Sequence, residues 1–372
     1  MIPVSQPSLG PAERALVNEC LDNVQLTYGP MTRRFERELA DYLKVRHVLA
    51  TSSGTTALHL ALVALGVGPR DEVLVPDLTF VATANAVFYT GAKVVLVDVD
   101  PRTWCLDLAD AAQKVTRRTK AVVPVHLYGV PCDLAGLREL AEIHKLLIVE
   151  DAAEGLTGTY ADRPLGSFGD AGIFSFYGNK ILTTGEGGAV ATDDEGLYQR
   201  LYLLRGQALD PKRRYYHPEV GFNYRMTDLQ AAVGVGQLGR LDQMVARRRD
   251  IFRLYRERLC YYGYASSGVR TDVAPWLYTL LLHHSVERDD LMAWLATQGI
   301  ETRPTFVPLH RLPTYRQEDH RFPVACRVGD HGLSLPTFPD LTFQQVDHIC
   351  DVILKKLVRM EDAYDVCMHA RS

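Results

Sequence analysis

The cysteines of this chain show no pattern that would indicate a disulfide framework or a metal centre. The seven are scattered over positions 20, 105, 132, 260, 326, 350 and 367, and none stands in a CxxC pair. An odd number of isolated cysteines favours a reducing compartment, and predicts neither a disulfide framework nor a zinc site. We therefore expect a cytoplasmic protein that holds no metal.

Long hydrophobic runs and an excess of one charge are also missing. No apolar stretch is long enough to span a bilayer, and Pro3 and Pro7 interrupt any signal-peptide core. The net charge of −4 gives no reason to expect nucleic acid or a membrane surface as a partner. The basic cluster at 247–249 is interpreted as the solvated face of a helix. Internal repeats and low-complexity tracts are absent.

The 372 residues, 47% of them hydrophobic, are enough for a large core and a second, smaller unit. Buried strands are predicted at residues 72–76, 93–98, 121–125 and 146–149, with helices between them such as 106–115 and 134–144. This alternation predicts an α/β fold with a mostly parallel sheet covered on both faces by helices. We expect a large domain over 1–240 and a small α+β domain over 241–372, linked by a long helix around 227–259.

The most informative segment is 174–188, which places Lys180 among small and neutral residues. Glu186 is the nearest acidic residue in the sequence, and an apolar run at 171–176 leads into the segment. An amine in such a setting is partly desolvated, so more of it is unprotonated and able to attack a carbonyl. The alternative is an ordinary solvated lysine. The pattern favours a lysine that forms a Schiff base.

A second segment, 145–154, ends a predicted strand with Asp151. The carboxyl ends of the strands are where open α/β sheets bind ligands. A carboxylate there can keep a pyridine nitrogen protonated, which makes the ring an electron sink. The alternative is that Asp151 serves as the N-cap of the following segment.

The third segment, 50–62, has small hydroxylic residues and Gly54 before an apolar helix. A helix N-terminus offers free N–H groups and a positive dipole end, which suit a phosphate. Gly54 lets the backbone approach closely, and Ser53 and Thr55 add hydroxyl donors. Phosphate, ring nitrogen and aldehyde are the three groups of pyridoxal 5′-phosphate (PLP) that these segments would bind.

With these motifs the chain resembles the DegT/DnrJ/EryC1/StrS sugar aminotransferases, which are fold type I PLP enzymes. The resemblance runs from residue 1 to about 342. The matching segments are 1–10, 29–36, 79–86, 126–129, 150–154, 174–188, 221–232 and 299–304. It implies a large PLP-binding domain, a smaller C-terminal domain, and transfer of an amino group from L-glutamate to a ketosugar nucleotide. Pyridoxamine 5′-phosphate (PMP) would be the aminated form of the cofactor.

The resemblance assigns roles to individual residues. Lys180 would carry PLP as a Schiff base and then move protons, and Asp151 would protonate the ring nitrogen. Phe80 would stack on the ring, where the alternative is a core phenylalanine. Ser175 would join Gly54 and Thr55 at the phosphate. Glu154 would approach the ring or its phenolic oxygen, where the alternative is an exposed loop carboxylate.

Asn223 implies a homodimer. In the family, the asparagine at this position reaches the PLP phosphate of the neighbouring subunit, so that each active site is built from two chains. The alternative is a turn asparagine before a helix capped by Thr227, and the two interpretations are compatible.

The substrate expectation rests on segment 205–217, which resembles the same region of GDP-perosamine synthases, enzymes that aminate GDP-4-keto-6-deoxy-mannose at C4. Residues expected on the substrate side are Arg213, Arg214, Tyr216, Arg303 and His310. Guanidinium groups suit a diphosphate, while surface arginine and core aromatic are the alternatives. Two departures concern the sugar: Val307 replaces a tyrosine, and the segment before Trp276 is short for that branch.

Other activities of the family stay open. They are amination of another 3- or 4-keto-6-deoxy sugar nucleotide, amination of a ketocyclitol, and removal of a hydroxyl by a PMP-dependent dehydratase. In such dehydratases a histidine replaces the lysine, so Lys180 argues against that activity. A catalytically inactive scaffold would be expected to have lost Lys180 or Asp151, and both are present.

Overall fold

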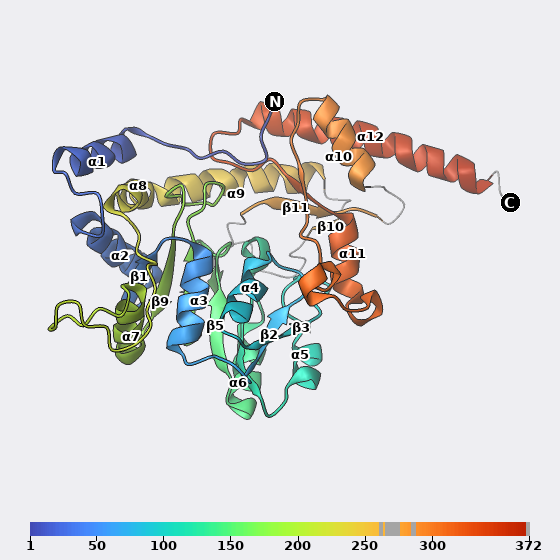
Figure 1. The fold of residues 1–372 in the computed structure, drawn as a ribbon. Helices are drawn as coiled ribbons and strands as arrows, with labels where there is room; N and C mark the ends of the chain where they lie inside the picture. Colours follow the sequence, from blue (N-terminus) through green and yellow to red (C-terminus); the bar gives the residue numbers. More distant parts are fainter. Residues whose placement is uncertain (260–262, 265–275, 284–287, 370–372) are drawn as a thin grey trace.

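The computed structural model describes residues 1–259, 263–264, 276–283 and 288–369, except for the side chains of 263–264 and of the residues beyond 357. A seven-stranded sheet forms the centre of the larger unit (Figure 1). Its strands, in spatial order, are β1 (His47–Thr51), β9 (Gly188–Thr192), β8 (Ala171–Ser175), β5 (Leu147–Asp151), β4 (Thr119–Val122), β2 (Glu72–Pro76) and β3 (Lys93–Val97). The pairs from β8 to β3 are parallel, and within this sheet β9 alone runs against its neighbours. The predicted mostly parallel sheet is confirmed.

Helices accompany this sheet. They are α1 (Pro11–Asp22), α2 (Pro30–Leu43), α3 (Gly54–Ala64), α4 (Ala82–Tyr89), α5 (Leu108–Lys114), α6 (Leu134–His144), α7 (Glu195–Arg205) and α8 (Asp228–Leu238). Helices such as α2, α3 and α7 contact its strands, whereas α1 packs on α8, which packs on α2. A short hairpin of β6 (Thr159–Tyr160) and β7 (Arg163–Pro164) follows β5. In the described part of the chain, no helix combines the length and the apolar composition that a bilayer crossing requires.

Local chemistry fixes where these elements begin and end. The Ser53 hydroxyl accepts from the Thr56 N–H and caps α3, and Thr227 caps α8 in the same way through Gln230. The predicted Thr227 cap is therefore confirmed. Strand β4 is shorter than the predicted run 121–125, because Pro124 has no N–H to continue the ladder.

The long helix predicted around 227–259 is two helices. Helix α8 ends at Leu238, and α9 (Leu241–Arg258) begins after a break at Gly239 and Arg240. Glycine is a poor helix former, and Arg240 leaves helical geometry while its Nε donates to Glu13 at 2.8 Å. The two helices run nearly in line between the large sheet and the C-terminal elements (Figure 1).

The smaller unit is an antiparallel sheet covered by helices. Its strand order is β10 (Gly263–Tyr264), β11 (Tyr278–Leu281), β13 (Gly332–Leu335) and β12 (Arg303–Pro304). Helices α10 (Arg288–Thr297) and α12 (Phe343–His369) contact each other and share a hydrophobic cluster with its strands β11 and β13, and α11 (Pro323–His331) leads into β13. Short 3₁₀ turns η2 (Leu309–Arg311), η3 (Pro313–Tyr315) and η4 (Asp319–Arg321) connect β12 to α11. These elements match the predicted α+β character.

Two hydrophobic clusters underlie the two units, and they divide within α9. Leu241 and Val245 belong to the larger cluster, whereas Ile251 and Tyr255 belong to the smaller one. Near the N-terminus, Ile2 forms an isolated β-bridge with Ile300 of the smaller unit. The predicted limits 1–240 and 241–372 stay a proposal, and the clusters favour a boundary inside α9.

Candidate active site

The predicted cofactor residues come from four strands that end at the same edge of the sheet. Gly54 begins α3 after β1, Phe80 lies past β2, Asp151 ends β5 and Ser175 ends β8. This carboxyl edge surrounds a cavity of about 550 Å³. The predicted residues that line it are Ser53, Gly54, Thr55, Phe80, Asp151, Glu154, Ser175, Lys180 and Arg303. The tertiary structure thus brings together motifs that are far apart in the sequence.

Asp151 is a buried residue that lines the cavity at this carboxyl edge. Its Oδ2 accepts a hydrogen bond from Thr83 Oγ1 at 2.8 Å, and its Oδ1 accepts from the Ala153 N–H at 3.2 Å. The residues after Asp151 form a turn, so the alternative role as a helix N-cap does not apply. Burial raises the pKa of Asp151, although the Thr83 hydroxyl acts in the opposite direction. A cation placed against this carboxylate would favour its ionised form.

Lys180 has an acidic partner that the sequence did not indicate. Its Nζ lies 3.5 Å from Glu154 Oε1, although Glu186 is the nearest acidic residue along the chain. Glu154 is buried and also accepts from the Tyr128 N–H at 2.8 Å, so it is not the exposed loop carboxylate of the alternative reading. Burial raises the pKa of Glu154 in spite of the neighbouring ammonium group. The Lys180 amine and the Glu154 carboxyl group thus lie within ion-pair distance inside the cavity.

Aromatic side chains form one wall of the cavity. Lys180 Nζ lies 3.8 Å from the centroid of the Trp276 ring, within cation–π range. Trp276 stacks on Tyr128, which stacks on Phe306 with centroids 5.9 Å apart. Phe80 lines the cavity beside Phe306 and is 56% exposed, so it is not a core phenylalanine. Its exposed face is available to a flat ring.

Trp276 is held from behind by a buried arginine. Arg248 Nη1 donates to the carbonyl oxygens of Trp276 and Thr337 at 2.8 and 2.9 Å. Arg248 is 1% exposed, and burial lowers its pKa to about 10. The interpretation of 247–249 as a solvated face is therefore wrong for Arg248. The Trp276 indole in turn donates to the Asn179 carbonyl at 2.7 Å, which fixes the chain beside Lys180.

The N-terminus of α3 forms a narrow cradle. A Cβ added to Gly54 would lie 2.9 Å from the Ser175 Cβ, so any side chain at position 54 would collide with β8. The first N–H groups of a helix have no partner within the helix. Together with the Thr55 and Ser175 hydroxyls, they supply the donors that a phosphate needs.

These observations fit PLP. The cavity offers a close-approach helix N-terminus for a phosphate, an exposed aromatic face for a ring, a buried carboxylate for a ring nitrogen, and an amine for an aldehyde. The donor set also includes residues that the sequence did not single out. Thr83 and Tyr128 position the two carboxylates, and Trp276 contacts Lys180. No spacing rule connects position 276 with 180, so the sequence carried no signal for that contact.

Other predicted residues lie outside this cavity. Asn223 is exposed, and its Oδ1 accepts from Arg225 at 3.4 Å. Arg213, Arg214 and Tyr216 lie on the exposed segment that leaves the body of the molecule after α7 (Figure 1). There Arg213 covers the Tyr216 ring at 3.7 Å. One chain by itself does not bring these residues to its own cavity.

His310, expected on the substrate side, does not line the cavity. It is fully buried, with Nδ1 2.6 Å from Asp77 Oδ2 and its ring stacked on Phe322. Of the expected substrate residues, Arg303 alone lines the cavity among the described residues. Val307, where a tyrosine was expected, is 56% exposed. The shortened segment before Trp276 falls at 265–275, outside the described residues.

The fold is that of the fold type I PLP enzymes. A sugar aminotransferase of Streptococcus pneumoniae in its PMP form superposes with a TM-score of 0.94 at 28% identity, covering 98% of this chain and 99% of that chain. Its PLP form superposes with a TM-score of 0.93 at 29% identity, covering 96% of this chain and 99% of that one.

The comparison of sequences identifies the family within the fold type I PLP enzymes. The DegT/DnrJ/EryC1/StrS aminotransferase family model matches residues 7–354, and the chain belongs to this family. A GDP-perosamine synthase of Caulobacter vibrioides is 46% identical, over 96% of this chain and 98% of its own. A second GDP-perosamine synthase, from Escherichia coli O157:H7, is 42% identical over 95% and 97%. The predicted family and aminotransferase class are thereby confirmed.

The contact between Thr83 and Asp151 allows a direct test of the ring-nitrogen site. Thr83→Val keeps the shape of the side chain but removes a hydrogen bond to a buried carboxylate, which is worth about 1.5–3 kcal/mol. We expect PLP to bind roughly 10-fold more weakly or worse, as measured by titration of the apoprotein. Thr83→Ser, which keeps the hydroxyl, is the matched control. Equal affinity in wild type and Thr83→Val would separate Thr83 from the cofactor site.

Proposed function

We propose that this protein transfers an amino group from L-glutamate to a GDP-linked 4-keto-6-deoxy sugar, GDP-4-keto-6-deoxy-mannose, using PLP attached to Lys180. The observation that carries the proposal is that Lys180, Asp151 and the α3 N-terminus line one cavity. Two relatives, 46% and 42% identical over nearly the whole chain, are GDP-perosamine synthases and support the choice of sugar nucleotide. Free thiols at the five cysteines whose side chains are described favour a cytoplasmic location.

Bound PLP would supply an electron sink that makes the proton next to the transferred nitrogen acidic. The residues of the chain then have separate tasks. Asp151 would keep the ring nitrogen protonated, and Phe80 would hold the ring flat. The N–H groups at Gly54 and the Ser175 hydroxyl would bind the phosphate.

Lys180 would release the cofactor when the amino donor arrives, and its Nζ would then carry protons between substrate carbon atoms and the ring. Glu154, 3.5 Å away, would hold the proton that Nζ gives up or returns. Trp276 and Tyr128 would cover this end of the cavity and keep water from the reacting atoms. Arg303, which lines the cavity as Lys180 does, would meet an anionic part of a substrate.

The exposed segment after α7 supports a shared active site. Asn223 and the two arginines at 213 and 214 are all exposed and follow α7, and none of them lines the cavity of its own chain. In a symmetric dimer, one contact would bring all three to the cavity of the partner, where Asn223 would bind the phosphate and the arginines the diphosphate. The homodimer and these roles remain proposals.

Mixing two inactive variants tests the shared site. In a hybrid dimer of Asn223→Ala and Lys180→Ala, one site loses both residues and the other keeps both. About half of randomly mixed dimers are hybrids, so activity should return to roughly one quarter of the wild-type value. Activity would be measured after co-expression or subunit exchange, with each variant alone as control. No recovery in confirmed hybrids would place Asn223 in the site of its own chain.

The first experiment on the function is the absorption spectrum of the purified protein with PLP. L-glutamate should bleach the band of the lysine-bound cofactor and release 2-oxoglutarate, and GDP-4-keto-6-deoxy-mannose should restore the band. Restoration by another ketosugar nucleotide or by a ketocyclitol would keep the aminotransferase and change the acceptor. Loss of the substrate hydroxyl without amino transfer would indicate a dehydratase, and no band with added PLP would overturn the proposal.

A further inference from the structure

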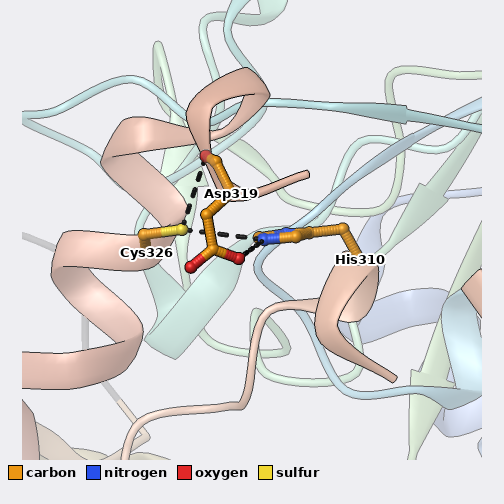
Figure 2. Close-up of side chains that lie close together, drawn as sticks. All are labelled: His310, Asp319 and Cys326. Atoms are coloured by element: carbon orange, nitrogen blue, oxygen red, sulfur yellow. Dashed lines mark hydrogen bonds and ion pairs between the residues drawn. The ribbon is translucent and has the colours of Figure 1, made fainter. Parts of the chain in front are cut away.

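Three side chains with metal-binding atoms meet outside the cavity, two from the turns that follow β12 and one from α11. Figure 2 shows His310 from η2, Asp319 from η4 and Cys326 from α11 pointing toward one another. His310 Nε2 lies 2.9 Å from Asp319 Oδ1 and 3.6 Å from Cys326 Sγ. The donor atoms all lie within 4.8 Å of one another, and no other such cluster occurs among the described residues.

His310 is oriented as a metal ligand would be. Its Nδ1 faces Asp77 Oδ2 at 2.6 Å, its backbone N–H donates to the other oxygen of Asp77 at 2.8 Å, and both residues are fully buried. A histidine that binds a metal through one nitrogen usually donates from the other to a carboxylate, which fixes the ring and makes it a better ligand. Asp77 provides that support and leaves Nε2 directed at Asp319 and Cys326.

The distances suit an ion of the zinc class. Tetrahedral zinc with nitrogen, oxygen and sulfur ligands places its donor atoms about 3.3–3.7 Å apart. The Nε2–Sγ distance already falls in this range, and the Nε2–Oδ1 pair would open by less than 1 Å. Asp319 is mostly exposed and Cys326 half-buried, so a fourth position can be filled by water. Imidazole with thiolate favours zinc over magnesium or calcium.

The charged groups around the three ligands are compatible with a bound divalent cation. Arg311 is the cation at the cluster, with Nη2 2.9 Å from Asp319 Oδ2 and Nε 3.3 Å from Oδ1. Asp330 also pairs with Arg311, so that two carboxylates, at 319 and 330, share one guanidinium group, while Asp77 pairs with His310. Arg311 can keep Oδ2 while Oδ1 turns to the ion. Binding would release the Cys326 thiol proton and replace any proton shared between Nε2 and Oδ1.

We propose that His310, Asp319 and Cys326 bind one Zn²⁺ ion, which fastens the turns η2 and η4 to α11. This site is separate from amino transfer, because none of the three residues lines the cavity. Nothing in the sequence indicated this site, since the ligands stand nine and seven positions apart with no CxxC pair. Only the chain path through the 3₁₀ turns brings them together.

The test uses untagged full-length protein treated with a chelator and then titrated with Zn²⁺ or Co²⁺. We expect one ion per chain, a higher Tm with zinc, and with Co²⁺ a thiolate charge-transfer band together with visible bands at longer wavelength than PLP absorption. Cys326→Ala should remove the charge-transfer band and weaken zinc binding by more than about 10-fold. Asp77→Asn, which changes the support of His310 and no ligand atom, should weaken binding about 10–100-fold.

One variant serves as a matched control. Cys20→Ala removes a buried thiol elsewhere in the chain and should bind zinc like wild type. Failure to bind either ion at millimolar concentration would overturn the proposal, as would unchanged binding in Cys326→Ala. Because metal content is read directly, these outcomes are independent of whether the protein transfers amino groups to a sugar nucleotide.

Discussion

Lys180→Ala is expected to lower amino transfer by more than about 10³-fold, because in the proposed mechanism Lys180 is both the amine that holds PLP and the group that moves protons. The cavity keeps the α3 N-terminus, Asp151 and Phe80, so PLP should still bind without a covalent bond. Turnover would be measured with L-glutamate and the ketosugar nucleotide. Borohydride reduction followed by mass spectrometry should label the wild type at residue 180 and leave the variant unlabelled.

Two further variants separate the roles of this amine. Lys180→Arg keeps a positive charge beside Glu154 but offers no nucleophile, so it should be as inactive as the alanine variant. Lys355→Ala removes an exposed lysine of α12 and should leave turnover unchanged. Wild-type turnover in either Lys180 variant would show that another group performs the chemistry.

Asp151→Asn should change activity and stability in opposite directions. Loss of the negative charge at the ring nitrogen should reduce turnover by about 10²–10⁴-fold, the range for removal of a positioned acid or base. In the apoprotein, burial raises the pKa of Asp151. The stability that this group contributes is therefore complete below its unfolded pKa and is lost as the pH rises through the folded pKa.

Asp151→Asn has no carboxyl group to ionise at this position, so it does not lose stability in this way as the pH rises. At neutral pH its apoprotein should have a free energy of unfolding equal to or higher than that of wild type, although its turnover is nearly gone. Urea unfolding of both apoproteins between pH 4 and pH 8 (an interval chosen around the usual carboxyl range) would show the wild-type curve falling relative to the variant. A control is Asp107→Asn, which alters the cap of α5 and should leave turnover unchanged. An unstable but active Asp151→Asn protein would contradict both expectations.

Much of the fold could be predicted because the large sheet is built from local signals. Buried parallel strands are continuous apolar runs, and helices such as α6 begin at a capping aspartate and show apolar periodicity. Predicted strand 72–76 and helix 134–144 coincide with β2 and α6. The prediction of a single long helix was wrong, because Arg240 leaves helical geometry where its side chain donates hydrogen bonds to Glu13 and Ser8. Such a tertiary contact has no local signature.

The sequence by itself determined the family and the mostly parallel sheet. It also predicted Lys180, Asp151 and Gly54 as cofactor residues, because each stands in a motif set by the strand or helix that carries it. Tertiary structure alone decided the pairing of Lys180 with Glu154, its contact with Trp276, the burial of Arg248 and the meeting of His310 with Cys326. These contacts depend on where distant segments come to lie and on which charges lose their water. The residues next to a side chain in the sequence do not indicate which distant segment it will contact or whether its charge will be buried.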